Sequence, residues 1–334
     1  MSSFPVSRRS LIVGLSLLGL GLSRTARAED APTKITSRVS KVASDARGVT
    51  ITLELAHAPF PAAGAWYRDP TVLVFVPHHH RRTRDGNISM VVHFHGHNSS
   101  AEKAMVAHQL REQLHDSKQN AILVVPEIAT FAADSSCGKL EAPGGFGRLL
   151  ADVLGTLDAK EVAAACGRAA IGAEASVGRV CVSAHSGGYH PAACAVKPQS
   201  GVAVQEVWLF DALYADMDVF RDWVIAGHGR PMASRHKLVS YFTGGNTANN
   251  TRALFAELDK AGVLVAEESV EGTLSREEIT RAEAVAIKTQ LTHGVVTSEL
   301  NNLRDCLYAS ALRRNLRSSW FDAKKGARPL ERRR

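Results

Sequence analysis

The sequence predicts an α/β fold with a mostly parallel central sheet, helices on both faces and an antiparallel start. Through the later part of the chain, short apolar runs alternate with helix-like stretches, which indicates strand–helix–strand crossovers between parallel strands. The first apolar runs are joined by short connections, which suits antiparallel neighbours. The 334 residues, 45% hydrophobic and 22% charged, are enough for one large core. No repeat or clear linker divides them, so we expect one domain.

Nine runs have the period-two or continuous apolar pattern of strands. They fall at about Lys34–Ala43, Gly48–Ala56, Thr71–Pro77, Ser89–Phe94, Ala121–Pro126, Arg179–Ser183, Glu206–Phe210, Lys237–Phe242 and Val263–Ser269.

Helix-like stretches lie between the later runs. They are Ala101–Ser117, Phe146–Leu157, Tyr189–Lys197, Met217–Ala226 and Thr247–Ala261. The spacing of Ser275 and Glu278 predicts a capping box that opens another helix. A final helix is expected over about Ser298–Arg317.

The N-terminus has the pattern of a targeting segment. A twin arginine, Arg8 and Arg9, precedes an apolar run to Leu22, and Ala26-Arg27-Ala28 offers a small-residue cleavage site. These features predict a twin-arginine signal peptide over residues 1–28, a domain over 29–318 and a basic tail over 319–334. The apolar run, about twelve residues long, is too short to span a bilayer. We therefore expect a periplasmic or secreted protein, exported by the twin-arginine machinery, with no stable membrane insertion.

The charge balance does not favour nucleic acid as a partner. Residues 1–28 contain four arginines and no acid, so the remainder has 36 basic and 33 acidic residues, a net charge of +3.

The cysteines give no sign of a zinc knuckle. Five cysteines contain no Cys-x-x-Cys pair, and we expect neither a metal nor an organic cofactor. Cys181 and Cys194 are expected to be buried thiols, whereas Cys137 and Cys166 are the pair most suited to a disulfide.

The stretch Arg179-Val-Cys-Val-Ser-Ala-His-Ser-Gly-Gly-Tyr189 carries the strongest functional signal. A β-branched run stops at Ser186, two glycines follow, and a helix then begins. Small residues, Ala184 and Gly188, stand two positions on either side of the serine. This pattern predicts a nucleophile elbow, a tight strand-to-helix turn that exposes the serine hydroxyl.

Candidate partners follow in a definite order. Asp211 ends the apolar strand Glu206-Val-Trp-Leu-Phe-Asp211, and His293 lies in a late loop. With this Ser–Asp–His order the chain resembles α/β-hydrolases over roughly residues 45 to 315. The resemblance implies a secreted esterase-, lipase- or depolymerase-like serine hydrolase with a catalytic triad: Ser186 as nucleophile, His293 as base and Asp211 as acid.

The acid and the base each have rivals. Many members of the family place the acid after the next strand, but Phe242-Thr-Gly-Gly-Asn-Thr-Ala-Asn-Asn250 contains no carboxylate. Asp211 occupies an accepted variant position, and Asp216 is the alternative acid. Other histidines that could compete with His293 are His190, His228 and His236.

An oxyanion hole needs preorganised donors. The amide of Gly187, directly after the serine, is one candidate. By resemblance to His-Gly motifs of the family, the amide of His97 is the second, with Gly96 giving the backbone freedom. The irregular segment from Glu127 to Gly145 is expected at the ligand-binding edge of the sheet.

The sequence allows four hypotheses of function. The favoured one is hydrolysis of a small-molecule or polymeric carboxylic ester through an acyl-enzyme. An amidase or peptidase of the same fold is the first alternative. The alternation of His93, His95 and His97 on a strand could instead bind a metal in a metal-dependent hydrolase. A non-catalytic binding protein is the last alternative.

Overall fold

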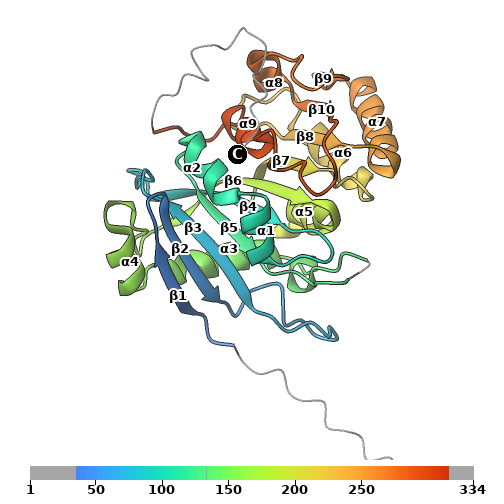
Figure 1. Ribbon diagram of the computed structural model, residues 1–334. Coiled ribbons are helices and arrows are strands. Elements are labelled where there is room, and N and C mark those ends of the chain that lie inside the picture. Colours follow the sequence, from blue (N-terminus) through green and yellow to red (C-terminus); the bar gives the residue numbers. More distant parts are fainter. Residues whose placement is uncertain (1–34, 133, 316–334) are drawn as a thin grey trace, which may run out of the picture. The chain divides into compact units, whose positions relative to one another are not determined.

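A ten-stranded sheet organises the computed structural model, which describes residues 35–132 and 134–315 (Figure 1). The strand order is β1-β2-β3-β5-β4-β6-β7-β8-β10-β9. Strands β1, β2, β3 and β5 pair antiparallel in that sequence, and every later pairing is parallel. This order and these directions are those of an α/β-hydrolase fold, as the sequence predicts. The predicted signal peptide and the basic tail from 319 lie outside the described residues.

The strands are β1 (Arg38–Ser44), β2 (Gly48–Glu54), β3 (Thr71–Pro77), β4 (Asn87–Phe94), β5 (Ile122–Pro126), β6 (Ser176–His185), β7 (Val204–Phe210), β8 (Lys237–Phe242), β9 (Val265–Glu268) and β10 (Ala284–Lys288). The helices are α1 (Ala101–Ala107), α2 (Leu110–Ser117), α3 (Gly145–Leu157), α4 (Lys160–Cys166), α5 (Tyr189–Val196), α6 (Met217–Gly227), α7 (Gly245–Lys260), α8 (Arg276–Arg281) and α9 (Asn302–Tyr308).

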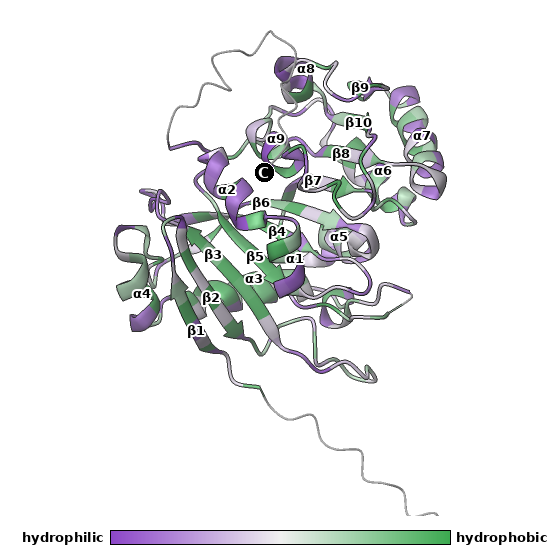
Figure 2. Cartoon of the chain, viewed as in Figure 1, coloured by the Kyte–Doolittle hydropathy of each residue, from purple (hydrophilic) through white to green (hydrophobic). Residues whose placement is uncertain are grey.

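Helices cover both faces of the sheet, because successive strand residues point to opposite sides. On β3, Val72, Val74 and Val76 pack into one apolar cluster with α3 to α7, while Leu73 and Phe75 pack into another with α1, α2, α8 and α9. Figure 2 shows the central strands in the hydrophobic colours that burial on both faces requires.

The nine predicted strands are confirmed, with ends shifted by a few residues. One capping prediction is also confirmed: the Ser275 hydroxyl accepts from the Glu278 amide, and the Glu278 carboxylate accepts from the Ser275 amide. No helix in residues 35–132 or 134–315 is long and apolar enough to cross a membrane.

Two helix predictions need correction, and one helix was missed. The stretch Ala101–Ser117 is two helices, because Gln109 adopts a left-handed φ of 48° that an α-helix cannot continue through. Helix α4 was not predicted. The last described helix, α9, is Asn302–Tyr308 and is shorter than the expected Ser298–Arg317.

The most consequential correction is β10, a strand that the sequence analysis did not predict. Its five residues, Ala284 to Lys288, are too few for periodicity to separate strand from helix. In the sheet, β10 lies between β8 and β9, parallel to both. His293 therefore closely follows the last described strand, with no helix between that strand and the histidine.

Candidate active site

Ser186 lies on a tight turn between β6 and α5. Its φ of 52° is in the left-handed region, which non-glycine residues seldom occupy outside strained or functional turns. A Cβ on Gly188 would lie 2.4 Å from the carbonyl oxygen of Phe94, so the turn packs directly on the end of β4. Ser186 itself is half-buried. The strand–turn–helix geometry expected of a nucleophile elbow is present here.

Asp211 and His293 form a hydrogen-bonded pair. Asp211 directly follows β7, and His293 lies in the loop after β10. His293 Nδ1 donates to Asp211 Oδ2 at 2.7 Å, which leaves Nε2 as the free nitrogen of the ring for a proton acceptor role. The carboxylate side chain is 4% exposed and the imidazole 43% exposed. The acid is thus buried and the base accessible.

Two threonines hold the Asp211 carboxylate. The Thr243 amide donates to Oδ1 at 3.1 Å and its hydroxyl donates to Oδ2 at 2.8 Å, while the Thr247 hydroxyl also donates to Oδ1. Burial raises the pKa of Asp211, but the hydrogen bonds from His293, Thr247 and Thr243 outweigh it and lower the pKa to about 2. The segment after β8, which lacks a carboxylate, supplies the donors that keep the preceding strand's carboxylate ionised.

His185 connects the serine turn to the histidine loop. Its Nε2 donates to the carbonyl oxygen of His293 at 2.8 Å, and the two imidazole rings lie 4.7 Å apart between centroids. Burial lowers the pKa of His185 to about 4, so the ring is neutral at pH 7. His293 is thereby fixed against the residue that precedes Ser186. Among the described residues no hydrogen bond joins Ser186 Oγ to His293.

The candidate oxyanion amides lie around the same turn. A Cβ on Gly96 would lie 2.8 Å from Ser186 Cβ, so only glycine allows this close approach. A Cβ on Gly187 would lie 3.1 Å from the amide nitrogen of His97. Among the described residues, no loop or turn hydrogen bond between backbone groups uses either amide as its donor.

The rival residues have other partners. Asp216 accepts from His190 Nδ1 at 2.8 Å and makes no contact of this kind with His293. His228 pairs with Glu283, at 2.7 Å. The His236 ring stacks on Trp223, with centroids 4.7 Å apart.

His93, His95 and His97 do not form a metal-ligand set. His93 is buried and hydrogen-bonded to Ser183 Oγ, while His95 is buried against Glu127 at 3.2 Å. His97 is exposed and contacts the carbonyl of Ala132. Among the described residues, the one group of three ligands close enough to share a metal contains none of these histidines. These three side chains therefore do not converge on one position.

The expectation of buried thiols at Cys181 and Cys194 is confirmed, but the predicted Cys137–Cys166 disulfide is wrong. The five thiols are free, and Cys137 lies near Cys194 of α5. Sequence reasoning did not find His185, Thr243 or Thr247 as supporting residues. The only local signal for them was their position immediately beside a strand end, where polar side chains gather in parallel sheets.

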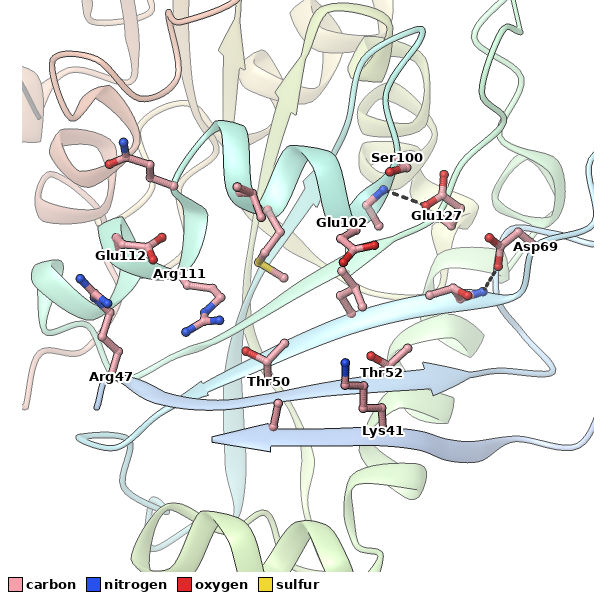
Figure 3. Close-up of a pocket in the computed structure, with 17 residues that line it drawn as sticks. Lys41, Arg47, Thr50, Thr52, Asp69, Ser100, Glu102, Arg111, Glu112 and Glu127 are labelled. Carbon is pink, nitrogen blue, oxygen red and sulfur yellow. Dashed lines mark hydrogen bonds between the residues drawn. The ribbon is translucent and has the colours of Figure 1, made fainter. Parts of the chain in front are cut away.

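A hollow lies elsewhere on the described part of the chain. It encloses about 850 Å³ over the exposed face of β1, β2 and β3 beside α1 and α2 (Figure 3). Its lining mixes cations such as Lys41 and Arg47 with acids such as Glu102 and Glu112, and it includes none of the residues around Ser186. It marks a stretch of sheet that the helices leave uncovered.

No protein-family model matches the chain, and no curated protein is significantly similar in sequence. Solved structures with similar backbones include an S-formylglutathione hydrolase from Agrobacterium tumefaciens, at 12% identity and a TM-score of 0.38, covering 81% of this chain and 96% of that one. A feruloyl esterase module from Clostridium thermocellum, complexed with sinapinate, has 9% identity and a TM-score of 0.45 over 85% and 91%. A fluorophosphonate-binding serine hydrolase from Staphylococcus aureus has 10% identity and a TM-score of 0.44 over 78% and 99%. Because the TM-scores are below 0.5, the fold rests on the strand order and the site on its geometry.

Proposed function

We propose that this protein is a serine hydrolase that cleaves carboxylic esters through an acyl-enzyme. The observation that carries the proposal is the His293–Asp211 hydrogen bond, fixed by His185 beside the left-handed Ser186 turn. A serine hydroxyl needs an adjacent base, and that base needs an orienting group. All three residues follow the carboxyl ends of parallel strands of one sheet, β6, β7 and β10.

In the proposed reaction, His293 Nε2 takes the proton of Ser186 as Oγ attacks the ester carbonyl carbon. Asp211, already ionised, stabilises the imidazolium that forms and fixes its tautomer. The Gly187 and His97 amides donate to the oxyanion of the tetrahedral intermediate. His293 then returns the proton to the departing alkoxide, and water releases the acid by the same route.

Esters are favoured over amides on chemical grounds, because an alkoxide departs more readily than an amine. An amidase or peptidase would use the same residues and stays the second candidate. A binding protein would have no need of an ionised Asp211 held by three donors and aimed at an accessible imidazole. The proposal includes export through the twin-arginine route, supported by Arg8, Arg9 and the small-residue cleavage site.

The test is labelling of the purified protein with a fluorophosphonate probe, with Ser186→Ala beside the wild type. We expect one label per chain in the wild type and none in the variant. Ester and anilide substrates with the same acyl group then separate esterase from amidase. A folded wild-type protein that takes no label and hydrolyses neither substrate would refute the proposal.

A further inference from the structure

Three potential metal ligands, none of them Ser186, Asp211 or His293, lie together at α5. Cys137 lies in the segment between β5 and α3, while His190 and Cys194 are one helical turn apart on α5. The sulfurs of both cysteines and a nitrogen of His190 all lie within 4.8 Å of one another. His190 Nε2 and Cys194 Sγ are 3.8 Å apart.

These separations suit a tetrahedral zinc ion. With Zn–S about 2.3 Å and Zn–N about 2.0–2.1 Å, tetrahedral angles place a nitrogen about 3.5 Å from a sulfur and two sulfurs about 3.8 Å apart. The observed spacing therefore needs only small side-chain movements to accept the ion. A ligand set of thiolates and an imidazole suits Zn²⁺ better than Mg²⁺ or Ca²⁺, which prefer oxygen ligands.

His190 is oriented as a metal ligand usually is. Its Nδ1 donates to Asp216 Oδ2 at 2.8 Å, so Nε2 is the nitrogen that faces the sulfurs. Histidine ligands almost always donate their second nitrogen to a carboxylate or carbonyl in this way, which fixes the ring and strengthens the ligand. A disulfide between the cysteines would leave this aspartate–histidine arrangement without a role.

The surroundings keep the thiols from solvent. Cys137 is fully buried and Cys194 is 3% exposed. Cysteine ligands of zinc bind as deprotonated thiolates, and a buried anionic sulfur gains most from a cation beside it.

We propose that Cys137, His190 and Cys194 bind one Zn²⁺ ion, contrary to the sequence expectation of no metal. Each thiol that still carries a proton releases it to solvent on binding, and the fourth position is left to a small ligand such as water. The ion would tie the segment after β5 to α5. Ser135 of that segment already lies beside the serine turn, 3.1 Å from where a Cβ on Gly187 would stand. The proposed ligands include none of Ser186, Asp211 and His293, so the site does not depend on whether Ser186 is a nucleophile.

The test is metal binding by the full, reduced chain. Protein stripped of metal is titrated with Zn²⁺ and, separately, with Co²⁺, whose thiolate charge-transfer absorption reports sulfur ligands. Cys194→Ser and His190→Ala remove proposed ligands, and Cys166→Ser removes a buried thiol elsewhere as the matched control. Circular dichroism checks that each variant is folded.

We expect one equivalent of Zn²⁺, a thiolate–Co²⁺ band, and a rise in Tm on Zn²⁺ addition in the wild type and Cys166→Ser. The affinity for Zn²⁺ should fall in both ligand variants by at least about tenfold, the smallest effect expected for loss of an outer-shell partner. A folded wild-type chain that binds no Zn²⁺ and shows no thiolate–Co²⁺ band overturns the proposal. So does equal binding by Cys194→Ser, or a Cys137–Cys194 disulfide in protein isolated without reductant and free of metal.

Discussion

Two histidine–aspartate pairs lie close to Ser186, and they differ in what the second imidazole nitrogen can reach. His293–Asp211 and His190–Asp216 have nearly equal Nδ1···Oδ2 distances, 2.7 and 2.8 Å. The ring of His293 lies against His185, next to the serine, whereas His190 Nε2 faces the thiol of Cys194. One pair thus lies against the residue that precedes the serine, and the other faces a thiol. The two histidine–aspartate pairs are therefore distinguished by the group beside the second imidazole nitrogen.

The largest expected effect separates the two histidines. His293→Ala should lower kcat/KM for an ester by about 10⁴-fold or more, because the serine loses its base. His190→Ala should lower it less than about tenfold, through the position of the adjacent segment alone. Steady-state hydrolysis at pH 7 measures both. Equal losses in the two variants would mean that the assignment of the base is wrong.

The next comparison concerns the two acids. Asp211→Asn should reduce kcat by about 10²- to 10⁴-fold, since the amide cannot stabilise the imidazolium. Asp216→Asn should reduce kcat less than about tenfold. The two substitutions are isosteric, so they form a matched pair. A greater loss in Asp216→Asn would restore Asp216 as the catalytic acid.

A smaller effect tests the close approach around the serine turn. Gly96→Ala should cost about 10²-fold in kcat/KM, because its methyl group would meet Ser186 Cβ at 2.8 Å and displace the hydroxyl. Gly155→Ala, on the open surface of α3 with no atom within 4 Å of the new methyl, is the control. It should keep full activity and gain about 0.5–1 kcal/mol of stability. Full activity in Gly96→Ala would argue against the proposed oxyanion geometry.

The smallest effect concerns the support of Asp211. The folded-state pKa of about 2 lies below the usual 3.8, so the stabilisation from the ionised carboxylate is complete above about pH 4 and is lost as the pH falls toward 2. Thr247→Val removes one donor and should cost about 1.5–3 kcal/mol at pH 7 and less at pH 3.

Unfolding of wild type and Thr247→Val by denaturant at both pH values gives the measurement. Thr280→Val is its control, because the Thr280 hydroxyl bonds a helix carbonyl in α8 and no carboxylate. Its cost should not change with pH. A pH-independent difference for Thr247→Val would show that the hydroxyl does not support an ionised Asp211.

Local signals decided what the sequence could predict. The Ser186 turn was predictable because a strand, a serine and two glycines follow one another in the chain. Asp211 was identified as the favoured acid, but the sequence could not exclude Asp216, since both follow β7 within a few residues. Choosing between them needs the fold, which brings one to His293 and the other to His190.

Features that depend on distant pairings escaped prediction. Strand β10 has five residues and is recognisable mainly by its place between β8 and β9. Cys137 and Cys194 lie close together although they are more than fifty residues apart in the chain. Sequence position alone therefore suggested Cys166 as the partner of Cys137. Thr243 and Thr247 hydrogen-bond to Asp211 because β8 pairs with β7, and the sequence does not show that pairing.

The left-handed backbone at Ser186 also bears on the history of the chain. Such a conformation costs a non-glycine residue of order 1 kcal/mol, which glycine would largely avoid. A chain under no demand for a hydroxyl at this turn would therefore become more stable by drifting to glycine there. The serine thus lowers the stability of the folded protein. In a protein that no longer needed the hydroxyl, selection for stability would favour its replacement by glycine.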